Sequence, residues 1–269
     1  MRRDRLIRFA AWVLPPVAVL ALVHAPTPSP GTERIRTVST TYPTNAAKIF
    51  RWGNAAWHDE FVDPLSATWK VNKPGQVRDQ HGMLTLDATP RGGTVTATAT
   101  GHNQRYGRWE ARVRGRQYGT GATPFHVLWE LVPMDSGGYH CGARSLMLSD
   151  YQLGRNHADV HVRNLPDADF TAGKWLPLDD DQFHTYAIEV TPDHVSWFVD
   201  TRVVMTERRS AARSGALFAP RFRLAAQPGA TMNQGRMQMD WVRYYTLHRP
   251  DARSIEAPSA TAASYGDAC

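Results

Sequence analysis

The sequence predicts an all-β fold in which two antiparallel sheets pack face to face. Runs of alternating apolar and polar residues recur from Trp57 to about His248, and turns rich in Gly, Pro, Asn and Asp separate them. The clearest example is HTYAIEVTPDHVSWFVDTRVVMTE, where two alternating runs flank the turn TPDH and predict a β-hairpin. No long segment has the 3.6-residue period of an amphipathic helix. Many short strands of this kind are typical of a β-sandwich.

The first 25 residues predict an export segment. MRRDRLIR is basic and FAAWVLPPVAVLALVHA after it is apolar, which is the order found in secretory signals. We expect residues 1–25 to be a signal peptide or, if uncleaved, an N-terminal membrane anchor, although an apolar stretch of about 15 residues is short for a full span. Residues 26–54 are rich in Pro, Ser and Thr and are expected to form a linker outside the fold. The protein is therefore expected to be secreted or associated with the cell envelope.

Seven further segments alternate in the same way as the hairpin and are expected to be strands. They are MLTLDA, TVTATAT, RWEARVRG, HVLWELV, DVHVRN, RFRLAA and RMQMDWVRYY. Together with the hairpin they place one domain at residues 55–248, followed by a C-terminal tail at residues 249–269.

Composition argues against nucleic-acid and nucleotide binding. The net charge is +6, but four arginines and one aspartate in the first eight residues account for half of it. The rest of the chain has the charge balance of an ordinary soluble domain, and the sequence contains no GxGxxG or phosphate-binding loop. We expect no nucleic-acid partner, and the sequence does not indicate an oligomeric state.

Five segments, in their order along the chain, resemble the enzymes of glycoside hydrolase family 16. They are WHDEFVDPLSATWKV, HGMLTLDA, QRYGRWEARVRG, DDQFHTYAIEVTPDHVSWFVDTRVV and MQMDWVRYY. Each is a generic amphipathic strand by itself, but their order and spacing are similar to that family over about residues 55–248. The resemblance implies a concanavalin-like jelly roll with a groove across its concave sheet. It also implies that the partner is a polysaccharide such as a β-glucan or a galactan.

The segment HCGARSLMLSDYQ, residues 140–152, takes the place of the family's catalytic strand. Retaining glycosidases need two carboxyl groups about 5–5.5 Å apart, one as the nucleophile and one as the acid and base. The family supplies them in the pattern Glu-x-Asp-x-x-Glu. Aligned on that pattern, Ser145 stands at the nucleophile position, Met147 at the middle Asp and Asp150 at the acid and base position. Two of the three carboxylates are therefore replaced.

Glu130 is the candidate for a second carboxylate. In HVLWELVP it shares a face with His126 and Leu128 by alternation, and the alignment places it where the family has a cleft tryptophan. An inverting mechanism would need it about 6.5–9.5 Å from Asp150, across the groove. The alternative is a solvent-facing strand residue without a chemical role.

Sugar-binding residues are expected on and around the strand that follows. In HADVHVRN, Asp159, His161 and Arg163 alternate with valines, and the resemblance places this strand in the groove. We expect His161 and Arg163 to bind sugar hydroxyls or an acidic substituent, and Trp129 or Tyr151 to provide a stacking platform. The alternatives are an exposed Asp159–Arg163 ion pair and core packing of the two aromatic residues.

Two further expectations concern a metal and a disulfide. The resemblance implies that Asp240, with carbonyl groups near Glu60, holds a structural calcium ion, although hydrogen bonding within its own sheet explains Asp240 equally well. No other cofactor is expected. Cys141 and Cys269 are the only cysteines. In an exported protein they either pair or stay two separate thiols.

These features lead to one leading hypothesis and two alternatives. The leading hypothesis is an exported protein that binds polysaccharide on a family 16-like scaffold and has lost its retaining carboxylates. The first alternative is an active endo-glycosidase or transglycosylase that uses Asp150 and a second carboxylate on a β-glucan or galactan. The second alternative is a structural protein of the cell envelope. Neither the sugar nor the linkage is indicated by the sequence.

Overall fold

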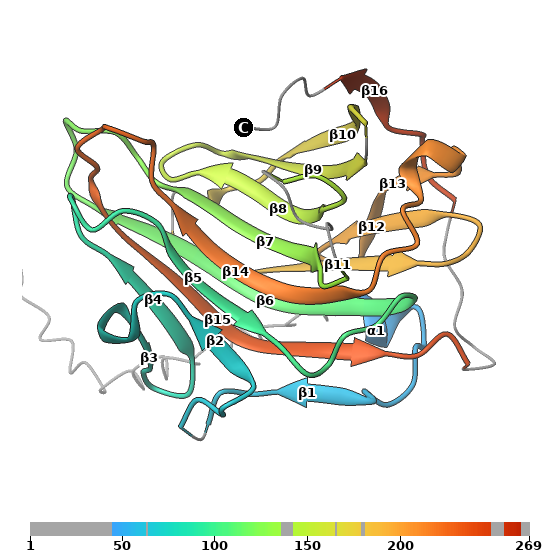
Figure 1. The fold of residues 1–269 in the computed structure, drawn as a ribbon, viewed down its shortest axis with the longest axis horizontal. Helices are drawn as coiled ribbons and strands as arrows, with labels where there is room; N and C mark the ends of the chain where they lie inside the picture. Colours follow the sequence, from blue (N-terminus) through green and yellow to red (C-terminus); the bar gives the residue numbers. More distant parts are fainter. Residues whose placement is uncertain are drawn as a thin grey trace, which may run out of the picture. The chain divides into compact units, whose positions relative to one another are not determined.

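Two antiparallel β-sheets stack face to face in the computed structural model (Figure 1). The structure describes residues 45–62, 64–135, 142–164, 166–178, 181–248 and 256–264. All of them belong to one compact unit, Tyr42–Cys269. The predicted all-β sandwich is confirmed.

The first sheet has the strand order β13-β12-β11-β6-β15-β4-β3, and β1 also pairs with β15. Its strands are β1 (Trp57–Asp59), β3 (Val77–Asp79), β4 (Leu84–Ala88), β6 (Gly107–Tyr118), β11 (His184–Val190), β12 (Val195–Val199), β13 (Arg202–Glu207) and β15 (Gln234–Tyr245).

The second sheet has the order β16-β10-β9-β8-β7-β14-β5-β2. Its strands are β2 (Trp69–Val71), β5 (Val95–Ala99), β7 (His126–Pro133), β8 (Leu146–Gln152), β9 (His157–Asn164), β10 (Ala168–Trp175), β14 (Phe218–Ala225) and β16 (Thr261–Ser264). Because the chain passes repeatedly from one sheet to the other, the topology is a jelly roll. The helical elements of the described chain are short, namely α1 (Ala46–Ile49) and two 3-10 turns, Pro74–Gln76 and Ser210–Ala212.

The core lies between the sheets and contains large aromatic side chains from both. Trp109 and Trp197 from the first sheet and Trp129 and Phe222 from the second are fully buried. The rings of Trp129 and Phe222 stack with their centroids 5.9 Å apart. Burial of a side chain the size of Phe222 stabilises the fold by about 1.5–3 kcal/mol. These residues occupy alternate positions in their strands, so the opposite face of the second sheet is left for a binding site.

The N-terminal part of the described chain covers the outer face of the first sheet. Residues of α1 and Trp52 pack with Phe198 and Tyr245 in a second hydrophobic cluster. The linker expected at residues 26–54 is therefore too long, because residues 45–54 are part of the fold. The apolar side chains of AAKIFRW bury themselves against the sheet, and the Pro/Ser/Thr-rich composition ends before them.

The end of the chain also contributes to the fold. Strand β16 pairs with residues Ala168–Thr171 of β10, and the backbone N–H of Ala260 donates to Glu207 Oε2 at 3.2 Å. The tail expected at residues 249–269 is therefore not wholly outside the domain. Its strand, TAAS, has small side chains that are all exposed, so it lacks the alternation that identifies the other strands.

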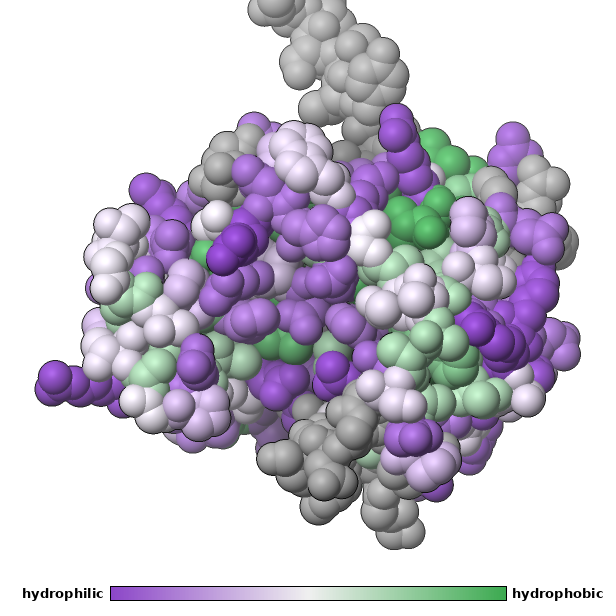
Figure 2. All heavy atoms as spheres, turned by 90° about the horizontal axis from the view of Figure 1, so that it is seen from above, coloured by the Kyte–Doolittle hydropathy of each residue, from purple (hydrophilic) through white to green (hydrophobic). Residues whose placement is uncertain are grey.

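Residues 1–25, expected to be a signal peptide or a membrane anchor, lie outside the described residues. In the part of the chain that the structure describes, no helix is long and apolar enough to cross a membrane. The face seen in Figure 2 is mostly hydrophilic, with hydrophobic side chains in separate groups.

Candidate functional site

An open pocket lies on the face of the second sheet that points away from the core. We call it the β8 pocket. It has a volume of about 340 Å³ and is lined by Pro124, His126, Leu128, Met147, Asp150, Arg163, Arg223, Ala225, Ala226 and Gln227. Four neighbouring strands, β9, β8, β7 and β14, supply seven of the ten lining residues, because alternate residues of a strand point to the same face, and Pro124, Ala226 and Gln227 come from the adjoining segments.

A β-bulge in β8 brings Met147 and Asp150 to the same side. The register of β8 against β9 shifts between these two residues, and the register of β8 against β7 shifts at the same place. In a regular strand, residues three apart point to opposite faces, whereas the extra residue of a bulge restores a common face. From the core side, Trp197 Nε1 donates to the carbonyl of Met147 at 3.2 Å. The two residues between Met147 and Asp150, which correspond to x-x in the family pattern, therefore form a β-bulge.

The three aligned positions, Ser145 just before β8 and Met147 and Asp150 within it, carry one carboxylate between them. Ser145 is fully buried, and its Oγ donates to the carbonyl of Gly142 at 2.5 Å. Met147 offers only a thioether at the floor of the pocket, where it is 2% exposed. Asp150 Oδ1 lies 3.1 Å from His126 Nδ1, and this hydrogen bond is the main cause of a raised pKa at His126. Asp150 is the one carboxylate that lines the pocket among the described residues.

Glu130 does not supply the missing carboxylate. It is fully buried, and Arg221 Nε donates to its Oε1 at 2.7 Å while Arg223 Nε lies 3.0 Å from the same oxygen. It does not line the β8 pocket. Both expectations for Glu130, a partner of Asp150 across the groove and a solvent-facing residue, are corrected. Arg221 is the cross-strand partner of Glu130 and Arg223 is two residues further along β14, and together they hold the Glu130 carboxylate at the sheet face.

The two aromatic residues proposed as stacking platforms are in the core instead. Trp129 is fully buried and Tyr151 is 3% exposed, and both belong to the main hydrophobic cluster. Burial raises the pKa of the Tyr151 hydroxyl. Neither side chain lines the β8 pocket, because alternation turns both toward the other sheet. Their expected contact with a sugar is therefore corrected.

His161 and Arg163 lie on the outer face of β9, as the alternation of HADVHVRN predicts. His161 Nδ1 lies 3.3 Å from Asp169 Oδ1, and Arg163 Nε lies 3.9 Å from Asp169 Oδ2. Arg163 lines the pocket, whereas His161 does not. The strand also carries Asp159, whose Oδ1 is 3.4 Å from His157 Nδ1.

Arg223 and His126 are pocket residues that were not proposed as ligand-binding from the sequence. RFRLAA already shows Arg221 and Arg223 two positions apart, hence on one face of a strand. That signal predicts a basic face, but it does not indicate which other strand lies beside it.

The residues near Asp240 do not fit a calcium site. Asp240 Oδ2 lies 2.7 Å from Arg112 Nη1, and the Glu60 carboxylate holds Arg243 through Nε at 2.8 Å. An arginine already neutralises each carboxylate, and the described residues contain no cluster of three or more His, Cys, Asp or Glu side chains placed to hold a metal ion. Cys141 and Cys269, whose pairing the sequence leaves open, lie outside the described residues.

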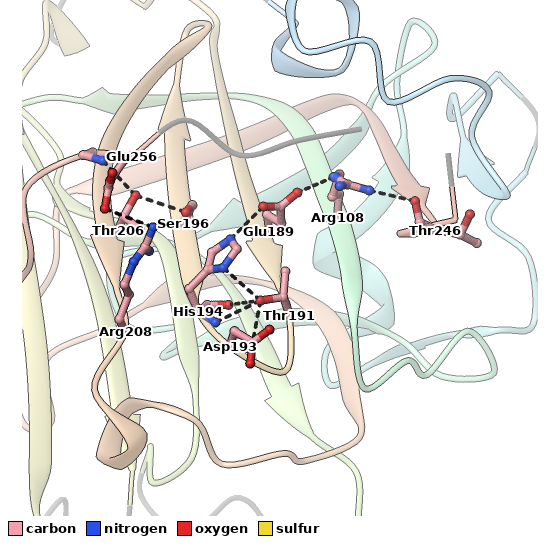
Figure 3. Close-up of polar contacts among 11 residues, drawn as sticks. Arg108, Glu189, Thr191, Asp193, His194, Ser196, Thr206, Arg208, Thr246 and Glu256 are labelled. Carbon is pink, nitrogen blue, oxygen red and sulfur yellow. Dashed lines mark hydrogen bonds and ion pairs between the residues drawn. The ribbon is translucent and has the colours of Figure 1, made fainter. Parts of the chain in front are cut away.

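A second polar cluster lies on the outer face of the first sheet and consists of Glu189, His194 and Thr191 (Figure 3). Its three side chains are spaced like a catalytic triad, but their hydrogen bonds are those that close a turn. His194 Nε2 lies 2.9 Å from Glu189 Oε1, and His194 Nδ1 lies 3.1 Å from Thr191 Oγ1. However, Thr191 Oγ1 also accepts the N–H groups of Asp193 and His194 and bonds the carbonyl of His194. The hydroxyl is committed to closing the hairpin, and this cluster is structural.

Comparisons with known proteins find the same fold. A scan against protein-family models and a search of curated proteins give no match. Among solved structures, the laminarinase from Rhodothermus marinus matches with a TM-score of 0.60 at 17% identity, over 72% of this chain and 97% of that chain.

Two further structures match in the same way. The endo-β-1,3-glucanase from Pyrococcus furiosus has a TM-score of 0.59 at 16% identity, over 72% of this chain and 94% of that chain. A non-specific endo-β-1,3(4)-glucanase from glycoside hydrolase family 16 has a TM-score of 0.60 at 15% identity, over 72% and 91%. At identities this low, the structural matches establish the fold alone. For the fold, the resemblance seen in the sequence is confirmed. This chain has the two-sheet jelly-roll fold of the family 16 β-glucanases.

Proposed function

We propose that this protein binds a polysaccharide in the β8 pocket and does not cleave it. The observation that carries the proposal is that Ser145, Met147 and Asp150 place one carboxylate where a retaining glycosidase needs two. The pocket lies on the sheet face that the resemblance assigns to substrate, and its Leu128 and Met147 floor gives a sugar ring an apolar surface. The export segment expected at residues 1–25 supports a role outside the cytoplasm or at the cell envelope.

Replacement of the nucleophile by Ser145 explains why cleavage is not expected. The Ser145 hydroxyl is buried and donates to a backbone carbonyl, so it has no anionic oxygen to offer a developing oxocarbenium ion. Asp150 alone can donate or accept a proton, but it cannot also attack the anomeric carbon and activate water. Binding through hydrogen bonds and ring contacts needs neither group.

A glycosidase that uses Asp150 and Asp159 is the second candidate, because the two residues are directly paired between β8 and β9. Cβ atoms of such pairs are about 4.5–5.5 Å apart, which is compatible with a carboxylate pair. Against this candidate, Asp159 is turned toward β10. Its Oδ1 would be 2.6 Å from a Cβ at Gly173, and its partner is His157.

The experiment uses the full-length chain and a panel of neutral and charged β-glucans, galactans and other polysaccharides. Binding is measured by affinity electrophoresis and calorimetry, and cleavage by new reducing ends after prolonged incubation. The variants are Asp150→Asn and Asp159→Asn. A matched control is Arg91→Met, which changes an exposed charge in a turn outside the pocket.

We expect binding by the wild type and by the control, and no new reducing ends with any protein. Reducing ends that vanish in both aspartate variants would replace the binding proposal with the glycosidase. Absence of binding to every polysaccharide would contradict both and favour the structural role.

A further inference from the structure

We propose that the polysaccharide bound in the β8 pocket continues across β9 to Trp175 on β10, where the indole ring stacks on one of its sugar rings. The inference rests on the proposed function and adds the class of ligand, a linear chain of hexopyranoses long enough to cross the sheet. Trp175 is the last residue of β10, and 69% of it is exposed.

The exposure of Trp175 sets it apart from the rest of its residue type. Every other tryptophan that the structure describes is buried or half-buried. An indole ring combines a broad apolar face with one polar N–H group, so it can hold the C–H face of a sugar while its edge stays in water. The ring of Trp175 is therefore available to a ligand and is not part of the core.

The neighbouring glycine shows which way Trp175 points. A Cβ atom at Gly173 would lie 2.3 Å from His157 Cε1 and 2.6 Å from Asp159 Oδ1, so both of these side chains lie over β10 on the outer face of the sheet. Residues two apart in a strand share a face. Trp175 therefore points to the same outer face as His157 and Asp159.

Polar groups that suit sugar hydroxyls lie beside the ring. His157 is the cross-strand partner of Trp175, and its Nδ1 lies 3.4 Å from Asp159 Oδ1. The side chains of His157 and Asp159 are 54% and 43% exposed. A carboxylate accepts hydrogen bonds from hydroxyl groups, and a neutral imidazole can donate or accept one. An apolar platform with a few polar groups at its rim is the combination that holds and orients a sugar ring.

A continuous row of paired residues connects this platform with the β8 pocket. Gly173 is paired with Asp159, and Asp159 is paired with Asp150. Asp150 is in turn paired with Leu128, and both of these residues line the pocket. From β14 at one side of the pocket to β10, the sheet order gives four strand spacings, or about 19 Å. This distance is several times the width of one sugar ring, so only an oligosaccharide or a longer chain can fill the whole site.

The test measures binding as a function of chain length. The probes are laminarin and a galactan, together with fragments of two to eight sugar units prepared from each polymer. Binding to the full-length chain is measured by calorimetry. The variants are Trp175→Ala, which removes the platform, and Trp175→Phe, which keeps an aromatic face. Val62→Ala is the matched control, because Val62 is 76% exposed and follows β1 in the first sheet, and unfolding curves verify that each variant is folded.

We expect the affinity of the wild type to rise with chain length up to about four sugar units or more, the length that reaches β10. Trp175→Ala should lower the affinity for these longer chains about tenfold and leave that of the disaccharide unchanged. Trp175→Phe should retain most of the gain with length, and Val62→Ala all of it. Long chains should also protect the tryptophan fluorescence of the wild type from quenching by acrylamide, and this protection should be lost in Trp175→Phe.

Equal affinities of the wild type and Trp175→Ala at every chain length would overturn the extended site and leave the proposed function intact. A loss in Trp175→Ala that is as large for the disaccharide as for the longer chains would overturn it too, because the ring would then belong to the primary site. The same applies to an equal loss in Val62→Ala. Failure of all fragments and of both parent polymers to bind would instead contradict the proposed function itself.

Discussion

Two carboxylates buried on opposite sheets, Glu130 and Glu189, are each held by two basic side chains, yet they serve different ends. Glu189 is 1% exposed. Its carboxylate accepts a hydrogen bond from Arg108 Nε at 2.6 Å and lies 2.9 Å from His194 Nε2. Arg108 also donates to the carbonyl of Thr246 at 2.8 Å, as Figure 3 shows. The arginines of Glu130 instead lie at an open sheet face.

The exposure of the arginine side chains separates the two clusters. The side chain of Arg108 is 3% exposed, whereas those of Arg221 and Arg223 are 15% and 24% exposed. Around Glu189 the chain itself supplies the remaining partners, including the ring of Trp52, whose centroid lies 5.5 Å from the Arg108 guanidinium. The comparison teaches that a buried carboxylate is structural when the fold encloses its arginine, and can serve a ligand when its arginines reach a pocket.

The largest effect is expected from removing one arginine of the enclosed cluster. Arg108→Met should lower the free energy of unfolding by about 3–5 kcal/mol, because Glu189 would be left buried with a weaker partner. The matched variant, Arg221→Met, should cost about 1–2 kcal/mol, since Arg223 stays and water reaches the site. Both values come from chemical denaturation. Equal losses in the two variants would break the distinction between the clusters.

A third buried carboxylate, Glu110, sharpens the comparison because backbone N–H groups hold it. Ala46 and Ala47 donate to its Oε1 at 2.5 and 3.3 Å. Burial raises its pKa from 4.5 to about 7. The folded protein therefore binds this proton more tightly than the unfolded chain, and the free energy of unfolding should fall as pH rises from about 4.5 to 7.

The variant Glu110→Gln should flatten this part of the pH profile. The lost pH dependence amounts to about 3 kcal/mol at pH 8 relative to pH 4, and the variant should be more stable than wild type above pH 7. Denaturation curves at a series of pH values measure it. Parallel profiles for wild type and Glu110→Gln would show that Glu110 is not the group that titrates.

The sandwich could be predicted because its signal is local. Alternation within each strand, as in HADVHVRN or RFRLAA, identifies both the strand and its two faces. Where alternation is missing the prediction failed, as in the TAAS strand. Composition also misled at residues 45–54, where apolar side chains cover the outer face of the first sheet. The aligned positions on β8 show that the x-x spacing corresponds to a bulge.

The partners within the pocket could not be predicted, because they depend on contacts between distant segments. Glu130 and Arg221 are 91 residues apart in the sequence and are joined only by the pairing of β7 with β14. Alternation also cannot say which face of a strand meets the core, and for that reason the sequence leaves Trp129 and Tyr151 either in the groove or in the core. The sequence shows which residues share a face of a strand, but the order of the strands in the sheet decides which residues of other strands lie beside them.

The smallest effect is expected at the edge of the β8 pocket, where a histidine titrates. The hydrogen bond to Asp150 raises the pKa of His126 above 6.5, while burial and the nearby Arg223 oppose it. Below that raised pKa, His126 adds a positive charge beside the pocket, so affinity for an anionic polysaccharide should fall about two- to threefold as pH rises through it.

The measurement is calorimetry with sulfated laminarin between pH 5.5 and 8.5. His126→Gln should remove the slope, and binding of any neutral polysaccharide should be insensitive to pH in both proteins. The charged or titratable groups that face His126 are Asp150 and Arg223. A slope that survives in His126→Gln would show that His126 is not the group that titrates.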